Sequence, residues 1–314
     1  MTIRFLSYLA FTFSAFFPAW AAVPSEAKEQ TAAISSEAKL AVGESKFTFE
    51  SWVGPALKVW AFVPDGIDLA HAPILIGMHG MERDADRYLR EWRTAAQSHG
   101  FVAIFPEFNR RDFPTSREYN LGNIVSRGSS DLRPRSQWSF AAIEPLFDDV
   151  VSRLSGTQQG YTLYGHSAGS QFVHRFLLTQ RNTRAKRYIA ANAGWYTLPT
   201  FALNYPDGAN ALDLGTEDLK AALAADTVIL LGEADTDTDS SNLNRSDAAM
   251  RQGKHRFARG QYFHAFGKEM ARREGWNFNW SLQTVPGVGH DNGGMAKAAG
   301  AFVLFDGEGP AASK

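Results

Sequence analysis

The chain has 314 residues, of which 44% are hydrophobic, and its formal net charge at pH 7 is -1. This length allows one α/β domain with a large core, and the near-neutral charge gives no electrostatic reason to expect nucleic acid as a partner. The sequence has no cysteine, which excludes disulfide bridges, thiolate metal sites and lipid attachment through a cysteine. The fold must therefore be stabilised by its core alone.

The first residues have the layout of a secretory signal peptide. Arg4 precedes an apolar stretch over residues 5–20, and residues 19–21 form an A-x-A cleavage pattern. We expect cleavage after Ala21, which makes residues 1–21 the signal peptide and the mature protein periplasmic or secreted. A membrane anchor is the alternative, but the apolar stretch is shorter than a span of about 20 residues and is interrupted by Pro18. We therefore expect no stable membrane insertion after cleavage.

Polar segments flank the region that is expected to fold. Residues 22–45 are rich in Ala, Ser, Glu and Lys and contain the tetrapeptide SEAK twice, which favours a flexible linker. Residues 307–314 are predicted to be a flexible tail. The stretch between them, residues 46–306, is expected to form a single domain.

From residue 46 on, short β-branched and aromatic runs alternate with segments of helical period. The runs over 46–53 and 57–64 are separated by Gly54 and Pro55, which predicts a hairpin of edge strands. Further strands are predicted over residues 73–80, 101–108, 161–164, 187–194, 227–232 and 280–287, and helices over residues 84–98, 138–154, 168–180, 216–224, 256–274 and 292–304. This alternation predicts an α/β fold with a mostly parallel sheet covered by helices on both faces. In such a sheet the chemistry lies at the carboxyl ends of the strands.

A G-x-S-x-G pattern lies where the strand over 161–164 meets the helix over 168–180. With 27 glycines in the chain the bare pattern arises easily by chance, so its context has to decide. A tight strand-to-helix corner strains its central residue, and Gly165 and Gly169 leave room for the chain to pass. Ser167 is therefore the predicted nucleophile. The amide of Ala168, at the helix start, is predicted to bind a developing oxyanion.

A serine nucleophile needs a base, and the base needs an acid to orient it. His290 is the candidate base because it follows the last predicted strand, in the glycine-rich loop VPGVGHDNGG. Asp235 is the candidate acid because it lies three residues past the end of the strand TVILLG, and Asp237 in the same loop is its rival. A calcium loop of the EF-hand type is excluded here, because its required Gly and Glu positions hold serines. No metal and no cofactor are predicted.

Residues after other strand ends are candidates for the rest of the site. The turn GMHGM follows the strand over 73–80, and the amide of Met81 in this turn is predicted to be the second oxyanion donor. Trp195, Tyr196 and Phe108 also follow strand ends and are predicted to form apolar walls for the substrate. Packing beneath the neighbouring loops is the alternative for these aromatic side chains.

Two further histidines are expected to be structural. His166, beside the predicted nucleophile, is expected to brace the corner rather than to react. His174 lies about two helical turns beyond Ser167, which is too far for it to act as the base.

The segments YGHSAGS, GEAD, PGVGHD and MHGM together resemble the α/β-hydrolase superfamily, over about residues 46–305. This resemblance implies that residues 46–306 form a catalytic domain with Ser167, Asp235 and His290 as its triad, in the chain order of that family. Within the superfamily the chain resembles exported esterases of the polyhydroxybutyrate-depolymerase and feruloyl-esterase type, although these often carry disulfides. No large cap domain is expected, because only 37 residues separate Gly194 from Gly232, the last strand included.

The predicted activity is cleavage of carboxylic esters, small or polymeric, through an acyl-enzyme intermediate. A serine peptidase or amidase would use the same residues and is the enzymatic alternative. A binding protein that kept the fold and lost catalysis is the alternative from another class.

Overall fold

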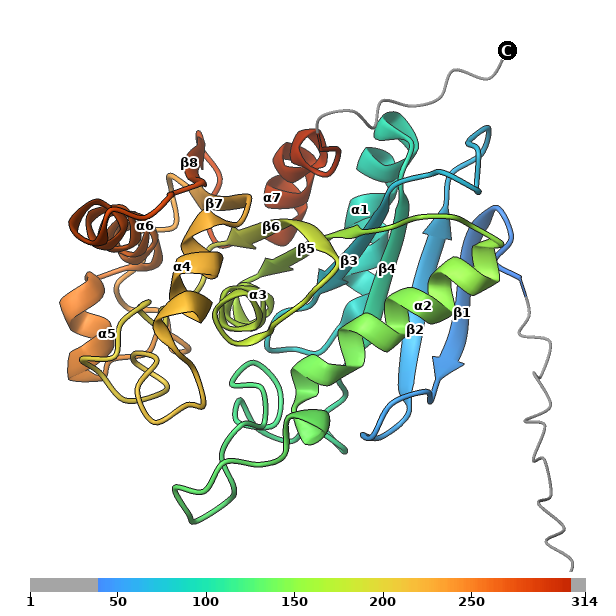
Figure 1. Cartoon of the computed structure of the whole chain (residues 1–314). Helices are drawn as coiled ribbons and strands as arrows, with labels where there is room; N and C mark the ends of the chain where they lie inside the picture. Colours follow the sequence, from blue (N-terminus) through green and yellow to red (C-terminus); the bar gives the residue numbers. More distant parts are fainter. Residues whose placement is uncertain (1–38, 306–314) are drawn as a thin grey trace, which may run out of the picture. The chain divides into compact units, whose positions relative to one another are not determined.

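The computed structural model of the chain describes residues 39–305 (Figure 1). The predicted signal peptide, the linker before residue 39 and the predicted tail lie outside the described residues. Within residues 39–305, no helix combines the length and the apolar character that a membrane crossing requires.

The described residues form one sheet of eight strands in the order β1-β2-β4-β3-β5-β6-β7-β8. The strands are β1 (Gly43–Phe49), β2 (Leu57–Val63), β3 (Ile74–Met78), β4 (Val102–Glu107), β5 (Tyr161–His166), β6 (Ala185–Ala191), β7 (Thr227–Gly232) and β8 (Trp280–Val285). β2 pairs antiparallel with β1 and β4, and every other pair is parallel, which confirms the predicted mostly parallel sheet.

Two details of the amino-terminal hairpin were predicted wrongly. β1 begins at Gly43, three residues inside the predicted linker, because its register with β2 extends to the pair Gly43 and Val63. β2 is not an edge strand, because its second side pairs with β4 from Lys58 to Phe62. The edge strand of the hairpin is therefore β1, and the other edge strand of the sheet is β8.

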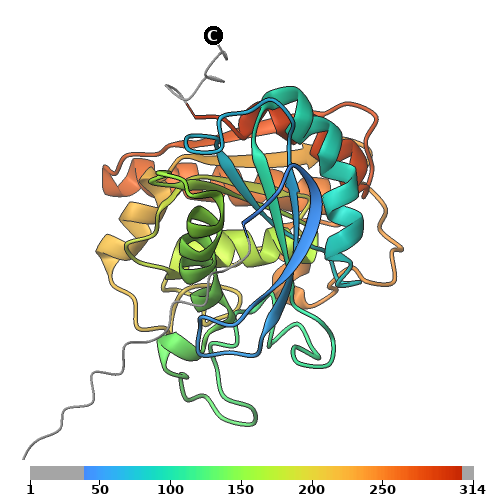
Figure 2. The same ribbon diagram turned by 90° about the vertical axis from the view of Figure 1, so that its right-hand side faces the viewer.

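Helices cover both faces of the sheet, as predicted (Figures 1 and 2). Their bounds are α1 (Ala85–His99), α2 (Ile143–Leu154), α3 (Ala168–Thr179), α4 (Thr216–Ala224), α5 (Asp247–Gln252), α6 (Arg256–Glu274) and α7 (Asn292–Ala299), with 3-10 turns η1 (Arg135–Gln137), η2 (Ser139–Ala142) and η3 (Gly300–Phe302). α1 and α7 pack in one core, and α2, α3, α4 and α6 pack in the other. β3 serves both cores: Ile74 and Ile76 face the second and Leu75 faces the first, as strand alternation requires.

The pattern of α1 illustrates why these segments become helices. Its buried positions include Tyr88, Leu89, Trp92 and Ala96, which recur at three- and four-residue steps and form one apolar face against the sheet. Burial of one such side chain, Leu89, contributes roughly 1.5–3 kcal/mol. The helix ends at Gly100, whose φ of 72° is a left-handed conformation that glycine adopts without strain.

Candidate active site

The predicted nucleophile lies on a sharp corner between β5 and α3. Ser167 has φ 58° and ψ -115°, a strained conformation for a residue with a side chain. A Cβ added to Gly165 would lie 2.2 Å from the backbone of Gly169, and one added to Gly169 would lie 1.9 Å from the carbonyl oxygen of Met78. Both glycines are therefore required by the close approach of the backbone, which is the physical basis of the G-x-S-x-G spacing.

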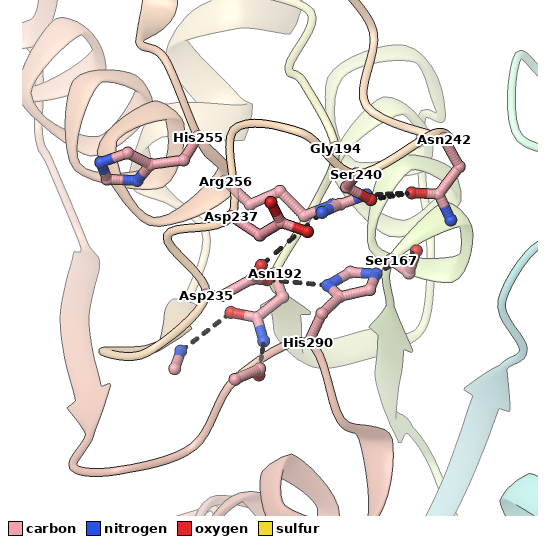
Figure 3. A network of polar contacts seen from close by, with 12 residues as sticks. Ser167, Asn192, Gly194, Asp235, Asp237, Ser240, Asn242, His255, Arg256 and His290 are labelled. Carbon is pink, nitrogen blue, oxygen red and sulfur yellow. Dashed lines mark hydrogen bonds and ion pairs between the residues drawn. The ribbon is translucent and has the colours of Figure 1, made fainter.

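A chain of hydrogen bonds joins the three residues that the sequence singles out (Figure 3). The Nε2 atom of His290 is 2.9 Å from Oγ of Ser167, and its Nδ1 atom is 2.7 Å from Oδ2 of Asp235. A carboxylate has no proton to give, so Nδ1 carries the hydrogen and Nε2 is left to accept the serine proton. The carboxylate is 1% exposed and the imidazole 26% exposed, so the base is open to a substrate while the acid is not.

The structure brings Asp235, and not Asp237, to His290. Asp237 is exposed, and its Oδ1 accepts a hydrogen bond of 2.8 Å from the amide of Asp239 within the loop. Asp235 is nearer the end of β7, whose last residue Gly232 accepts a hydrogen bond from the Asp235 amide. The first turn of this loop therefore fixes the Asp235 backbone.

A buried arginine lies behind the acid, and sequence reasoning missed it. Arg256, at the start of α6, is 2% exposed, and its Nη1 is 3.6 Å from Oδ1 of Asp235. Its Nη2 donates to Ser240 and Asn242 in the acid loop. Burial lowers the pKa of Arg256, and the charges of Asp235 and Asp237 oppose that effect. The sequence places Arg256 only at the start of a basic helix, with no signal that it faces a carboxylate.

Asn192, just after β6, ties the acid strand to the histidine loop, and it too was missed. Its Oδ1 accepts a 2.8 Å bond from the amide of Gly232, and its Nδ2 donates over 3.1 Å to the carbonyl of Gly289 (Figure 3). The residue is fully buried with φ 49°, a conformation that Asn tolerates better than most residues. The side chain thus fixes the separation of Asp235 and His290.

Met81, in the turn after β3, lines the same pocket as Ser167. Among the described residues, no atom accepts a hydrogen bond from the amide of Met81 or of Ala168. His79 braces this turn, because its Nε2 accepts from the amide of Phe108 and its Nδ1 donates to the carbonyl of Gly80, both over 3.0 Å. Burial lowers the pKa of His79 to about 3, so the ring is neutral.

Solved structures resemble this chain closely over nearly its whole described length. Poly(aspartic acid) hydrolase-1 from Sphingomonas sp. KT-1 is 42% identical with a TM-score of 0.82, over 84% of this chain and 99% of that one. LpqC, a poly(3-hydroxybutyrate) depolymerase from Bordetella parapertussis, is 31% identical with a TM-score of 0.79, over 87% and 93% of the two chains. The chain belongs to the α/β-hydrolase superfamily.

An S-formylglutathione hydrolase from Agrobacterium tumefaciens shares the α/β-hydrolase fold at only 13% identity, with a TM-score of 0.53 over 84% of this chain and 95% of that one. No family model matches the sequence, and no curated protein sequence matches it. Of the two more similar structures, one is named as a hydrolase and the other as a depolymerase, so this chain is a hydrolase of the same fold.

Two adjoining pockets flank the nucleophile of this α/β-hydrolase. One, of ≈ 140 Å³, is lined by Ser167 and His290 among others, and the second, of ≈ 340 Å³, is lined by Gln171 and Trp195 among others. Met81 and Asn242 line both pockets, so the two meet at the oxyanion turn and the acid loop. Within residues 39–305, no group of three or more His, Asp or Glu side chains is placed to hold a metal ion.

Two of the three predicted substrate walls are corrected by burial. Tyr196 is 0% exposed and stacks on Phe263 of α6, with ring centroids 4.4 Å apart. Phe108 is also 0% exposed and packs against Phe113, with centroids 4.8 Å apart. Neither side chain reaches a pocket, because each fills the core beneath the site. Trp195 alone of the three lines a pocket wall.

The two other histidines near the corner are buried and neutral. His166 packs its ring 4.7 Å from that of His290, and its Nδ1 is 3.1 Å from the hydroxyl of Tyr88. His174 donates from Nδ1 to the carbonyl of Ser170 and accepts at Nε2 from the amide of Thr197. Burial lowers the pKa of both histidines well below the ordinary value. Both side chains are therefore braces in this fold, as expected.

Proposed function

We propose that this hydrolase cleaves carboxylic esters, with Ser167 as nucleophile, His290 as general base and Asp235 as the acid that orients it. One observation carries the proposal: Ser167 Oγ, both ring nitrogens of His290 and the Asp235 carboxylate are linked by hydrogen bonds of 2.9 and 2.7 Å. The strained backbone of Ser167 supports it, because a corner of this kind exposes the hydroxyl to substrate.

In the first half of the reaction, Ser167 Oγ bonds to the acyl carbon while Nε2 of His290 accepts the hydroxyl proton. The carbonyl π electrons move onto its oxygen, and the amides of Met81 and Ala168 donate hydrogen bonds to that oxyanion. One such donor is worth about 3 kcal/mol of transition-state stabilisation. The bond to the leaving oxygen then breaks, His290 protonates the alkoxide, and the alcohol departs.

In the second half, a water molecule takes the place of the alcohol. His290 accepts a proton from the water as its oxygen attacks the acyl-serine, and the same two amides bind the second oxyanion. Collapse of this intermediate returns the proton to Ser167 Oγ and releases the carboxylic acid. The bond from Nδ1 to Asp235 keeps the imidazole in the tautomer that both halves require.

Amide hydrolysis by the same residues is a second candidate. The observation that favours it is the 42% identity to a protein named poly(aspartic acid) hydrolase-1, whose named substrate is a polymer of amide-linked units. Expulsion of an amine demands that His290 protonate the leaving nitrogen before the bond breaks. Relative kcat/KM on matched ester and anilide substrates will separate the two activities.

We further propose that the enzyme acts after export, as a periplasmic or secreted protein without stable membrane insertion. The support is the sequence of residues 1–21, with its basic start, apolar stretch and A-x-A end. An ester of small or polymeric form is the proposed partner, and nucleic acid is not expected at this net charge. Amino-terminal sequencing of protein recovered outside the cytoplasm tests the proposal, which predicts a mature chain that begins at Ala22.

A fluorophosphonate probe tests the nucleophile, because it labels an activated serine without the need for a known substrate. The wild type should be labelled, and Ser167→Ala should abolish the labelling and lower ester hydrolysis at least about 10³-fold. Ser170→Ala is the matched control, since Ser170 is buried one turn further along α3 and its hydroxyl has no partner among the described residues. A folded wild type that takes up no label would favour a non-catalytic binding protein instead.

A further inference from the structure

The larger of the two pockets at the site has walls of uncommon chemistry. We call it the amide pocket, because Gln171, Asn242 and Asn244 line it together with Trp195 and Met81. None of its eleven lining residues is acidic or basic. Gln171 lies one helical turn after the nucleophile, since its backbone N–H donates to the Ser167 carbonyl over 3.1 Å. A group bound there would lie beside the scissile bond.

The carboxamide of Gln171 has a fixed direction. Its Oε1 accepts hydrogen bonds from Nη1 of Arg175 and Nδ2 of Asn120, both over 3.1 Å. A guanidinium has only donors, so the oxygen of Gln171 has to face it and the Nε2 group has to face away. Among the described residues, nothing accepts a hydrogen bond from this Nε2 group. The pocket wall therefore offers an N–H donor at this point.

Two of the other three carboxamides of the pocket, those of Asn242 and Asn244, also have a bonded oxygen, whereas the Nδ2 group of Asn120 donates to Gln171. Oδ1 of Asn242 accepts from Nη2 of Arg256 and, over 2.7 Å, from the Ser240 hydroxyl (Figure 3). Oδ1 of Asn244 accepts a 2.9 Å bond from the amide of Ser246. Both Nδ2 groups are left without an acceptor in the described part of the chain. Three residues that line one pocket thus have N–H₂ groups without an acceptor among the described residues.

Positive charge lies behind these donors and is not neutralised by ion pairs. Arg175 and Arg259 are each 0% exposed, and no carboxylate among the described residues lies within ion-pairing distance of either guanidinium. Arg175 lies over the ring of Trp195, 4.6 Å from its centroid, and Arg259 donates to the carbonyls of Gly194 and Asn244. Burial lowers the pKa of both guanidinium groups to about 10, which leaves them charged at neutral pH.

We propose that the amide pocket binds a free carboxylate on the acyl part of the substrate, with Gln171 and Arg175 as the residues that select it. The inference rests on the proposed function and adds the substrate class: esters or amides of acids that carry a second, ionised carboxyl group. The acyl part is assigned here because His290, which must protonate the leaving group, lines the other pocket. A buried cation without a carboxylate partner favours an anion in the pocket over a neutral carbonyl.

The kinetic test compares two substrates with the same leaving group. The 4-nitrophenyl monoester of glutaric acid carries the free carboxylate, and its methyl-capped form does not. Wild type should have at least about tenfold higher kcat/KM on the free acid, since a factor of ten needs only about 1.4 kcal/mol. Gln171→Glu should remove or reverse this preference, because the new carboxylate pairs with Arg175 and repels the substrate.

The matched control is Gln159→Glu, the same change at an exposed residue. Gln159 lies just before the amino end of β5, whereas Ser167 follows the carboxyl end of the same strand. It should leave the ratio of the two kcat/KM values unchanged. Equal activity of the wild type on both substrates, or an unchanged ratio in Gln171→Glu, would overturn the proposal while the esterase function stands.

A binding measurement separates this inference from the proposed function. Calorimetric titration of Ser167→Ala with monomethyl glutarate should show binding, and adding Gln171→Glu to this variant should weaken that binding at least about tenfold. Neutral dimethyl glutarate should bind equally weakly to the single and the double variant. If Ser167→Ala bound the anion but the wild type hydrolysed neither ester, the result would support the pocket and contradict the esterase function. No binding of the anion would contradict the pocket.

Discussion

Two regions of the site hold their residues by different means. At the nucleophile corner, close backbone contact holds the residues in place: β5, α3 and β3 approach so closely at Gly165 and Gly169 that no Cβ fits at either glycine. Around the acid and the histidine, side chains hold the backbone: Asn192 bonds the end of β7 and the histidine loop, and Arg256 forms an ion pair with Asp235. Steric contact fixes the first region and polar pairing fixes the second, so they should fail under different substitutions.

The largest expected effect is that of Asp235→Asn, which leaves the shape of the acid loop unchanged. An amide can offer N–H in place of a carboxylate oxygen and favours the wrong imidazole tautomer, so kcat on a 4-nitrophenyl ester should fall about 10³- to 10⁴-fold. Asp237→Asn, two residues along, should change kcat less than about threefold because Asp237 is exposed and bonded within the loop. If steady-state kinetics gave the reverse order, Asp237 would be the acid.

Gly169→Ala tests the steric side of the comparison. The new Cβ would lie 1.9 Å from the carbonyl oxygen of Met78, so β3 and α3 must separate, and the free energy of unfolding in urea should fall by about 3 kcal/mol or more. Gly289→Ala is the control beside the catalytic histidine, since its nearest added contact is Ala234 O at 3.7 Å. Equal stability of the two variants would mean that the backbone at the corner can accommodate a Cβ at Gly169 without loss of stability.

Asn192→Ala tests the polar side. It leaves the buried amide of Gly232 and the part-buried carbonyl of Gly289 unpaired, which should lower the free energy of unfolding by about 2 kcal/mol more than the control does. Asn182→Ala is that control: Asn182 also has a positive φ, of 56°, but is exposed. A drop in kcat/KM should accompany the first change only. Equal losses in both variants would reduce the role of Asn192 to backbone conformation.

Acid should destabilise the corner before the acid loop, because neutral buried imidazoles brace the corner. The pKa of His79 is lowered by burial to about 3, against about 6.5 when unfolded, so the unfolded chain binds more protons between these values. Stability from this residue is fully present above pH 6.5 and falls by about 1.4 kcal/mol for each unit below it. His166 and His174 act in the same direction.

Thermal unfolding at pH 7.5 and pH 5.5 measures this effect. The midpoint should fall on acidification, and amide exchange should become faster around β3 and α3 before it does so after β7. A midpoint that is independent of pH over this range would mean that these rings are protonated in the fold without cost.

The fold and the hydrogen-bonded residues were accessible from sequence because their signals are local. Ser167, Asp235 and His290 each follow a recognisable strand, and parallel strands deliver their carboxyl ends to one edge of a sheet. The hydrogen bonds that join the three side chains agree with that placement.

The features that sequence reasoning missed depend on partners far along the chain. Tyr196 is buried by Phe263, 67 positions later, so its neighbours in sequence give no sign of its fate. Arg256 meets Asp235 only because α6 folds back over the loop after β7. The short helix α5, Asp247–Gln252, lies within a polar stretch whose composition resembles a loop.

The two ends of the described chain leave the sheet on the side away from the nucleophile. The amide of Leu40 donates to the carbonyl of Arg153, near the end of α2, and Arg187 at the start of β6 binds the carbonyl of Leu304. Both contacts lie at the amino ends of the parallel strands, whereas Ser167 lies at a carboxyl end. Attachment at residue 39 or residue 305 would therefore leave the side of the sheet that carries Ser167 facing away from the support.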